Sequence, residues 1–335
     1  MVDRRAILDV LQSHTKVLSE LLPATVEEHE GHLEPVTFLR NWVWPSKPLV
    51  VRNDECVASW PALSKSLWRD QEYLNRALRD TKVTVALTPD GLADAPMDGF
   101  FMLPAESTMP YSRFVQMLER QSPVVYLQKQ NNSFVDEFSA LAADVGRIAW
   151  ADCAFGAANL DAINFWQGAW PTKTSWHRDP YENMYVVLRG TKRVRLLPLT
   201  DAYRMRVKQY QQARWKYENG RFVSHQLEGE SVAWSSLPPC TCARAADTAD
   251  KTDTARCVSC AHLADHPPKE VLLNAGDVLY IPAWTYHELS HDSDQLGDTI
   301  AINFWYDTQY GQHGFATMQT FDRLAELCAV TASGN

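Results

Sequence analysis

The chain has 335 residues, of which 45% are hydrophobic and 22% are charged, and its formal net charge at pH 7 is −9. This length and hydrophobic content predict a large buried core, and they exclude fibrous and disordered classes for most of the chain. The negative balance argues against broad binding to nucleic acid and is compatible with basic protein substrates. We therefore expect a globular protein without a nucleic-acid partner.

The N-terminal segment does not have the pattern of a signal peptide. Residues 1–12 interrupt their apolar positions with charges and continue to Leu22 as a candidate amphipathic helix. The sequence contains no run of 18 apolar residues, so we expect no membrane association. Its seven cysteines are an odd number in irregular positions, which favours a reducing compartment. These features predict a cytosolic or nuclear protein.

In chain order, three regions follow one another. Residues 1–120 mix helical and other patterns and end in an amphipathic helix predicted over 111–120. Residues 121–310 are rich in strand patterns and form the predicted core. Residues 311–335 end the chain with apolar residues at helical spacing, a stripe more typical of packing on its own domain than on a partner. The stripe consists of Met318, Phe321, Leu324, Ala325 and Cys328.

The most informative motif is a histidine and a carboxylate two positions apart, His177 and Asp179, near the start of the strand-like run 174–185. Side chains on a strand alternate between faces, so the two are predicted to project to the same side. With a second imidazole they make the 2-His-1-carboxylate triad of non-haem Fe(II) oxygenases. By composition, 10 histidines and 41 acidic residues in 335 predict roughly one chance match to this pattern, so its context must decide.

A candidate for the third ligand is His287. Residues 275–287 read as a turn, an apolar strand, a proline stop and an aromatic-rich approach to this histidine. The next β-rich run, 299–306, presents Asn303 and Trp305 on one face, and a polar asparagine in so apolar a strand needs a partner. Other histidines are interpreted as ordinary core or surface residues, namely His14, His32, His225, His291 and His313.

Beyond the triad, five segments resemble the Jumonji-C (JmjC) oxygenases of the factor-inhibiting-hypoxia type, most closely their lysyl 3-hydroxylase subgroup. They are 60–63 (WPAL), 87–95 (LTPDGLADA), 126–130 (YLQKQ), 164–166 (NFW) and 303–307 (NFWYD). The resemblance implies a mainly β fold with flanking helices, in which 121–310 form a double-stranded β-helix, the jelly-roll or cupin-like JmjC barrel. It also implies a homodimer through the C-terminal helix.

The resemblance further implies three cofactors or co-substrates, Fe(II), 2-oxoglutarate and O2. His177, Asp179 and His287 are then the catalytic metal ligands. Lys192 is our candidate cation for the far carboxylate of 2-oxoglutarate, because it opens the strand 192–198 directly after a glycine turn. The family pattern assigns carboxylate or co-substrate contacts to five positions, which are Tyr126, Thr174, Asn183, Lys192 and Asn303.

The activity implied by the resemblance is C-3 hydroxylation of a lysyl residue in developmentally regulated GTP-binding proteins. Three alternatives stay open. A metal-dependent endopeptidase would need neither Lys192 nor 2-oxoglutarate. An N-methyl-lysine or N-methyl-arginine demethylase is the nearer rival, although the sequence lacks a second histone-reading module. A silent binding protein fits poorly with an intact triad.

Residues 235–268 depart from the family pattern and are interpreted as an insertion in the barrel. Two cysteine pairs, C-x-C and C-x-x-C, are separated by 14 residues, with His262 and His266 close behind. Such a set predicts either a structural zinc site at the base of the loop or a flexible loop with incidental thiols, and the sequence leaves both open. The candidate zinc ligands are Cys240, Cys242, Cys257 and Cys260, with His262 as a substitute for one cysteine.

Overall fold

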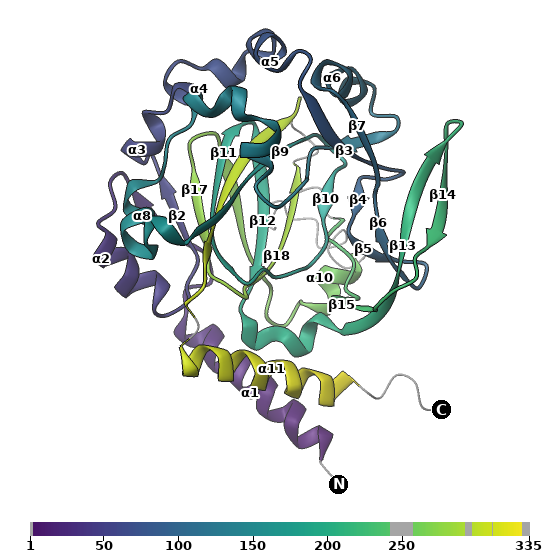
Figure 1. Ribbon diagram of the computed structural model, residues 1–335. Coiled ribbons are helices and arrows are strands. Elements are labelled where there is room, and N and C mark those ends of the chain that lie inside the picture. The colour runs from purple at the N-terminus through teal and green to yellow at the C-terminus, as the bar shows by residue number, and fades with distance from the viewer. Residues whose placement is uncertain (1–2, 242–256, 292–296, 310, 330–335) are drawn as a thin grey trace.

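The computed structural model describes residues 3–241, 257–291, 297–309 and 311–329. Two β-sheets lie at its centre, and helices from the first half of the chain cover the outer side of the larger one (Figure 1). The first and last helices lie side by side beyond the end of the sheets, and both chain ends are on this side. This layered arrangement is the mainly β fold with flanking helices that the sequence predicts.

The larger sheet has six strands in the order β1-β2-β17-β11-β19-β9, in which all pairs except β1–β2 are antiparallel. The bounds are β1 Glu27–Glu30, β2 Leu49–Arg52, β9 Leu160–Gly168, β11 Tyr181–Arg189, β17 Val278–Ile281 and β19 Thr299–Asp307. Two of these strands, β1 and β2, come from the region before residue 120. One edge of the larger barrel sheet is therefore formed by strands from the N-terminal region.

The smaller sheet has five strands in the order β16-β12-β18-β10-β4. The bounds are β4 Leu92–Ala93, β10 Lys173–Thr174, β12 Thr191–Leu197, β16 Lys269–Asn274 and β18 Tyr286–His291. The two sheets share an apolar core between them. Val187 of β11 and Ala301 of β19 meet Val194 of β12 and Leu289 of β18 there. This packing is the double-stranded β-helix expected from the resemblance.

Strand β11 shows how the sequence produces these layers. Its residues 183–188 are all buried, because both faces of the strand are covered. Tyr185 and Val187 face the core between the sheets, whereas Met184 and Val186 face the helical layer. Full burial of each such side chain contributes about 1.5–3 kcal/mol to folding. Parity along this strand also places Asn183 on the inner face.

The covering helices pack on the outer side of the larger sheet (Figure 1). Phe38, for example, makes edge-to-face contacts with Trp150 and with Tyr280 of β17, both at 4.9 Å between ring centroids. The α-helices are α2 Pro35–Phe38, α3 Glu55–Ala58, α4 Pro61–Ser64, α5 Gln71–Leu78, α6 Tyr111–Arg120, α7 Ser133–Glu137 and α8 Ala149–Phe155. The short π and 3-10 helices are η1 Leu39–Val43, η2 Leu67–Arg69, η3 Ser139–Asp144 and η4 Ala157–Asn159. The helix predicted over 111–120 is confirmed as α6.

Two smaller sheets extend the fold next to the barrel mouth, with strand orders β7-β3-β8 and β14-β13-β6-β5. Strand β15 pairs with the first residues of β13, over 207–210. The bounds are β3 Lys82–Thr88, β5 Ala95–Met97, β6 Phe100–Leu103, β7 Ala105–Pro110, β8 Val124–Tyr126, β13 Val207–Glu218, β14 Arg221–Gln226 and β15 Val232–Ser235. The β13–β14 hairpin stands out from the body of the molecule (Figure 1).

The terminal helices are α1 Arg4–Leu21 and α11 Gln312–Ala329, and both contact the 3-10 helix η5 Leu199–Met205. His14 of α1 lies against Phe321 of α11, with 5.6 Å between ring centroids. The predicted helices at both ends of the chain are therefore confirmed. Within the described residues, no helix has the length and hydropathy needed to cross a bilayer.

Candidate active site

His177 lies in the short segment between β10 and β11, and it is tied directly to His287 at the start of β18. The two residues form an isolated antiparallel bridge, with each backbone amide donating to the other's carbonyl at 3.1 and 2.8 Å. Their rings are 4.2 Å apart. The strand-like run predicted from 174 is thus interrupted, because β10 ends at Thr174 and β11 begins only at Tyr181.

Both imidazoles are oriented by a backbone carbonyl two residues earlier in the chain. The Nδ1 atom of His177 lies 2.7 Å from the carbonyl of Ser175, and that of His287 lies 2.8 Å from the carbonyl of Thr285. A carbonyl can only accept, so each Nδ1 carries the hydrogen and each Nε2 keeps its lone pair. This arrangement fixes the tautomer that a metal ligand requires.

Asp179 completes the group. Its Oδ2 atom lies 3.9 Å from Nε2 of His177 and 3.6 Å from Nε2 of His287. The Asp179 carbonyl accepts from the amide of Trp284 at 2.8 Å, which fixes this loop against the approach to β18. One donor atom from each of the three residues lies within 4.8 Å of the others. The three predicted ligands therefore converge, with their donor atoms facing one centre.

The protonation states suit a cation. Burial, reinforced by the neighbouring His287, lowers the pKa of His177 to about 4, so this imidazole is neutral at physiological pH. Burial raises the pKa of Asp179, but the hydrogen bond to His287 and the electrostatic interactions with both imidazoles lower it more, and the net pKa lies below the usual value. Two imidazoles and one carboxylate are a donor set that suits Fe(II).

Lys192 lies deeper in the barrel and is almost fully buried, with 1% of its surface exposed. Its Nζ atom contacts Nε2 of His291 at 2.9 Å and the hydroxyl of Tyr126 at 3.4 Å. Among the described residues, no carboxylate pairs with it. Burial consequently lowers the pKa of Lys192 to about 7. A buried amine without a counterion is a cation site prepared for an anionic ligand.

The other four predicted co-substrate residues line the recess between the triad and Lys192. Asn303 donates from Nδ2 to Oδ1 of Asn183 at 3.1 Å and accepts from the indole of Trp166 at 2.9 Å, which supplies the partner its strand requires. The Thr174 hydroxyl accepts from the amide of Leu289 at 3.0 Å. The structure therefore brings Tyr126, Thr174, Asn183 and Asn303 together with the triad.

A larger cavity of about 490 Å³ opens on the outer side of His177. Its wall includes two acidic residues of different character. Glu106 pairs with Arg214 at 3.2 Å, whereas among the described residues the Asp94 carboxylate accepts a hydrogen bond only from the neutral amide of Gln128, at 2.8 Å. Burial raises the pKa of Asp94 to about 6, so it is still mainly ionised at neutral pH. The cavity thus carries a carboxylate available to a cationic side chain.

Two features of the site were missed from the sequence. The sequence pattern presents His291 as an ordinary histidine, yet it is buried, contacts Lys192, and its Nδ1 has no hydrogen-bond partner among the described residues. Its parity with His287 on β18 is the signal that was available. The other is Trp234 of β15, whose ring is parallel to that of His177 at 6.0 Å and whose indole donates to Ser175 at 2.8 Å. Trp234 directly precedes the predicted insertion 235–268, and no local sequence pattern indicates that it contacts His177 or Ser175.

Three of the predicted zinc ligands also come together, since Cys240, Cys257 and Cys260 place their sulfur atoms within 4.8 Å of one another. Cys242 lies outside the described residues. His262 is not part of this group, because its Nε2 bonds to the carbonyl of Arg204 at 2.9 Å and its Nδ1 lies 3.0 Å from Arg206. The carbonyl of His266 likewise accepts from Arg204.

Comparison with known proteins agrees with this geometry. A profile of the family described as "Cupin-like domain" matches residues 35–312. The chain belongs to this cupin-like family and, by its relatives, to the JmjC proteins. The family resemblance and the barrel fold predicted from the sequence are therefore confirmed.

Three relatives show how far the similarity extends. The chain is 35% identical to the lysine-specific demethylase JMJ32 of Arabidopsis thaliana over 300 residues, covering 86% of this chain and 84% of the relative. It is 36% identical to the human bifunctional peptidase and (3S)-lysyl hydroxylase JMJD7 over 282 residues, with 82% of each chain covered. It is 30% identical to the JmjC domain-containing protein E of Dictyostelium discoideum over 306 residues, again covering 82% of each.

Proposed function

We propose that this protein is an Fe(II)- and 2-oxoglutarate-dependent dioxygenase that hydroxylates a lysyl residue of a protein substrate. One observation carries the proposal: two imidazoles and a carboxylate converge at the barrel mouth, with a buried lysine behind them that pairs with no carboxylate of the described residues. Bound Fe(II), with 2-oxoglutarate and O2, supplies the oxidising chemistry that hydroxylates a C–H bond.

In this proposal the protein's residues bind, orient and exclude water. His177, Asp179 and His287 hold the metal and leave the remaining positions open to co-substrates. Lys192 pairs with the terminal carboxylate of 2-oxoglutarate, and Tyr126 donates its hydroxyl to the same group. The recess is walled by Trp166 and Trp305, which keep bulk water from the reacting atoms.

The outer cavity supports a cationic substrate side chain. Asp94 lies in its wall, and no cationic side chain of the described residues contacts its carboxylate. Trp234 and Phe101 provide flat apolar surfaces beside it, with 4.7 Å between their ring centroids. A lysine side chain fits such a site, because its stem packs on aromatic rings while its ammonium meets a carboxylate. The name of the human relative, which includes (3S)-lysyl hydroxylase, supports the same substrate class and C-3 as the position.

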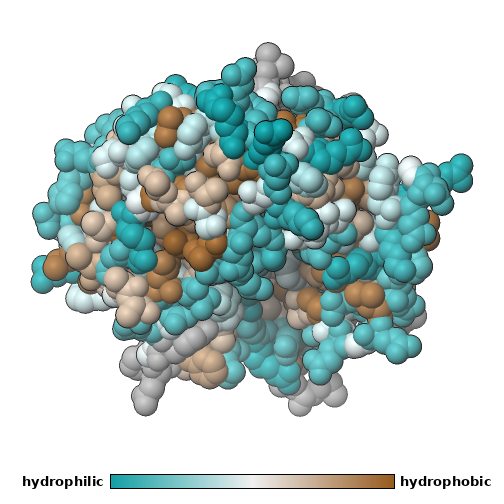
Figure 2. All heavy atoms as spheres, turned by 45° about the horizontal axis from the view of Figure 1, so that its top comes forward, coloured by the Kyte–Doolittle hydropathy of each residue, from teal (hydrophilic) through white to brown (hydrophobic). Residues whose placement is uncertain are grey.

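For the substrate protein we propose a GTP-binding protein of the developmentally regulated class, as the family resemblance implies. The molecular face shown in Figure 2 is mostly hydrophilic, and its hydrophobic residues gather mainly in the left half of the view. Such a surface fits a substrate that is bound transiently through polar contacts better than one held in a permanent complex.

We also propose a homodimer in the cytosol or nucleus. The apolar stripe of α11 is half-buried against its own chain, but Phe315 stays 46% exposed, and α1 beside it exposes Val10 and Leu21 by 66% and 73%. These side chains provide an apolar surface for a second copy. Light scattering, which measures the molar mass in solution, tests this proposal. We expect the unaltered protein to be a dimer and the Phe315→Glu variant to be a monomer.

The test of the main proposal is succinate release from 2-oxoglutarate by the Fe(II)-loaded protein, with and without a peptide from the lysine-containing loop of such a GTP-binding protein. We expect peptide-stimulated succinate and a peptide mass gain of about 16 Da. The matched control peptide has arginine in place of the lysine and should stimulate nothing. Succinate release without a change in either peptide would retain the oxygenase and reject the lysyl substrate.

Demethylation is the second candidate, favoured by the 35% identity to the lysine-specific demethylase JMJ32. The same assay with an N-methylated lysine peptide distinguishes it, because demethylation removes about 14 Da per methyl group and releases formaldehyde. An endopeptidase would instead shorten the peptide without consuming 2-oxoglutarate. Lys192 argues against the peptidase, since hydrolysis gives this buried amine no role.

A further inference from the structure

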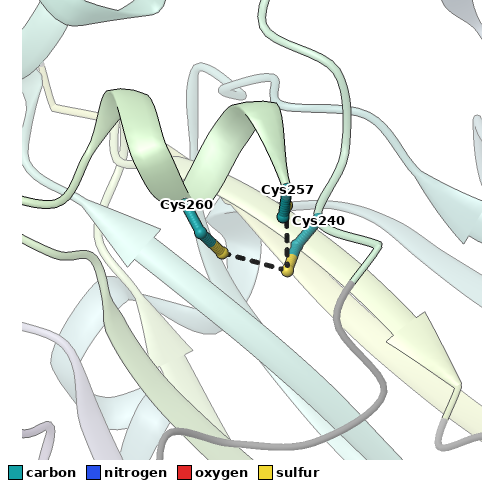
Figure 3. A group of neighbouring side chains, drawn as sticks. All are labelled: Cys240, Cys257 and Cys260. Atoms are coloured by element: carbon teal, nitrogen blue, oxygen red, sulfur yellow. Dashed lines mark hydrogen bonds between the residues drawn. The ribbon is translucent and has the colours of Figure 1, made fainter. Parts of the chain in front are cut away.

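A second cluster of potential metal ligands lies outside the triad, at the base of the inserted segment. Cys257 precedes the short helix α10 Val258–His262, Cys260 lies within it, and Cys240 approaches from the segment after β15. Figure 3 shows the three side chains directed toward one another. The Sγ atom of Cys240 is 3.4 Å from that of Cys260 and 3.9 Å from that of Cys257.

These separations match a shared metal ion. Zinc–sulfur bonds of about 2.3 Å in a tetrahedron place neighbouring sulfurs about 3.8 Å apart, close to both distances. A disulfide needs about 2.05 Å between sulfurs and would join only two of the three. A cluster of three thiols therefore fits a metal site better than a redox pair.

Hydrogen-bond donors surround the sulfur atoms of this cluster. Backbone hydrogen bonds from Thr241 and Cys260 reach the sulfur of Cys257, whose side chain is buried. The guanidinium of Arg195 lies 3.6 Å from the sulfur of Cys260. Amide donors and a nearby cation stabilise anionic sulfur, which is the form that binds zinc.

We propose that Cys240, Cys257 and Cys260 bind a structural Zn²⁺ ion that is separate from the catalytic metal. Three thiolates account for three of the four tetrahedral positions of a structural zinc site. Soft sulfur donors select Zn²⁺ over Fe(II) in this cluster, whereas the nitrogen and oxygen donors of the triad suit Fe(II). In this proposal the different donor atoms of the two sites select a different metal for each site.

The cluster is linked by hydrogen bonds to residues next to both triad histidines, so a bound zinc ion would stabilise the active site. The indole of Trp176, next to His177, donates to the hydroxyl of Ser259 in α10 at 3.3 Å. On the other side the amide of Cys240 donates to Glu288, next to His287, at 3.1 Å. Zinc binding therefore fixes α10 against the neighbours of both triad histidines, and the base of the insertion becomes part of the support of the active site.

The first test is metal analysis of the full-length protein, purified without added metal, together with zinc-edge X-ray absorption. The proposal predicts about one zinc per chain with at least three sulfur ligands at about 2.3 Å. Cys257→Ser and Cys260→Ser should each lose the zinc, while Cys153→Ser, on the exposed face of α8, should retain it. Asp179→Ala should also keep its full zinc content, because its side chain belongs only to the triad.

A readout on the unaltered protein keeps the test valid if the serine variants fail to fold. A mercurial reagent that attacks thiolates should release one zinc per chain to a chromogenic chelator, and zinc removal should lower the melting temperature. Zinc-free protein after expression with supplied Zn²⁺, or a mass 2 Da lower from a disulfide between Cys240 and Cys260, would overturn the proposal. Either result would leave the proposed hydroxylase activity untouched.

Discussion

His177 and His287 hold each other in place through two reciprocal backbone hydrogen bonds, although 110 positions of the chain separate them. The bridge sets the distance between the imidazoles, and the carbonyls of Ser175 and Thr285 set their tautomers. Metal-binding geometry is thus determined by the backbone before any metal arrives. Little reorganisation is required on binding, which favours both affinity and a precise position for the bound ion.

Removing the carboxylate of the triad should abolish metal binding while preserving the fold. In Asp179→Ala the imidazole of His177 remains neutral, because burial keeps its pKa at about 4, so its ring leaves no unpaired charge behind. We expect the Mn²⁺ affinity to fall more than about 100-fold and succinate release to stop. Metal titration with circular dichroism checks this. Asp80→Ala, whose side chain is 91% exposed, is the control, and turnover in Asp179→Ala equal to the unaltered protein would contradict the assignment.

The affinity for 2-oxoglutarate should fall as the pH rises above 7. Burial lowers the pKa of Lys192 to about 7, and the carboxylate of a bound ligand pairs only with the protonated amine. The affinity for 2-oxoglutarate is therefore highest below pH 7, and it falls by up to about tenfold per pH unit above pH 7. Calorimetric titration with Mn²⁺ in place of Fe(II), which prevents turnover, measures this dependence.

In Lys192→Met we expect 2-oxoglutarate to bind roughly 10- to 150-fold more weakly and without this pH dependence, because the charged hydrogen bond is lost. Lys82→Met, an exposed lysine on β3, should behave as the unaltered protein. A Lys192→Met variant that binds 2-oxoglutarate with unchanged affinity would show that the anchoring cation lies elsewhere.

Asp94 should determine how tightly a lysyl peptide binds. Burial raises its pKa to about 6, so the carboxylate is charged above pH 6 and becomes neutral as the pH falls below it. We expect the KM for the peptide to rise below pH 6, and Asp94→Asn to raise it roughly tenfold at pH 7.5 with no dependence on pH. Asp98→Asn, in an exposed turn, is the matched control. Equal KM values for Asp94→Asn and Asp98→Asn would remove Asp94 from the substrate site.

Gly168 should tolerate no side chain, because the ring of Tyr126 occupies the space. An added Cβ would lie 2.6 Å from a ring carbon of Tyr126 and 2.8 Å from the hydroxyl of Thr172. Gly168→Ala should therefore cost about 1–3 kcal/mol of unfolding free energy and weaken 2-oxoglutarate binding through Tyr126. Gly311→Ala, where a Cβ meets nothing within 4 Å, should change neither denaturation midpoint nor affinity. Unchanged binding in Gly168→Ala would separate Tyr126 from the co-substrate site.

The triad was predictable from the sequence because each of its members carries a local signal. His177 and Asp179 stand two apart, and His287 follows an apolar strand with a proline stop. The family resemblance then implied the barrel and the co-substrate residues. Within β11, Asn183 lies on the same inner face as Tyr185, because strand alternation is a property of the local backbone.

The remaining features depend on contacts between distant segments, which no local pattern encodes. Strand β2, which carries β1 on its other edge, pairs with β17 through partners more than 220 positions away, as Leu49 with Tyr280 shows. His291 acquires its role only from Lys192, which lies directly opposite on β12. The break before Tyr181 arises because His177 pairs with His287 rather than continuing the strand of β11. Tertiary pairing overrode the local pattern at this point.

The central claim is that the triad delivers an oxygen atom from O2 to a lysyl residue of a protein. The most direct measurement is mass spectrometry of the peptide after turnover under ¹⁸O2 with Fe(II) and 2-oxoglutarate. The account predicts a gain of about 18 Da on the lysine in place of about 16 Da under ordinary O2, and no gain with Asp179→Ala. Shortened peptides that carry ¹⁸O only when the solvent is H2¹⁸O would contradict it and identify a hydrolase.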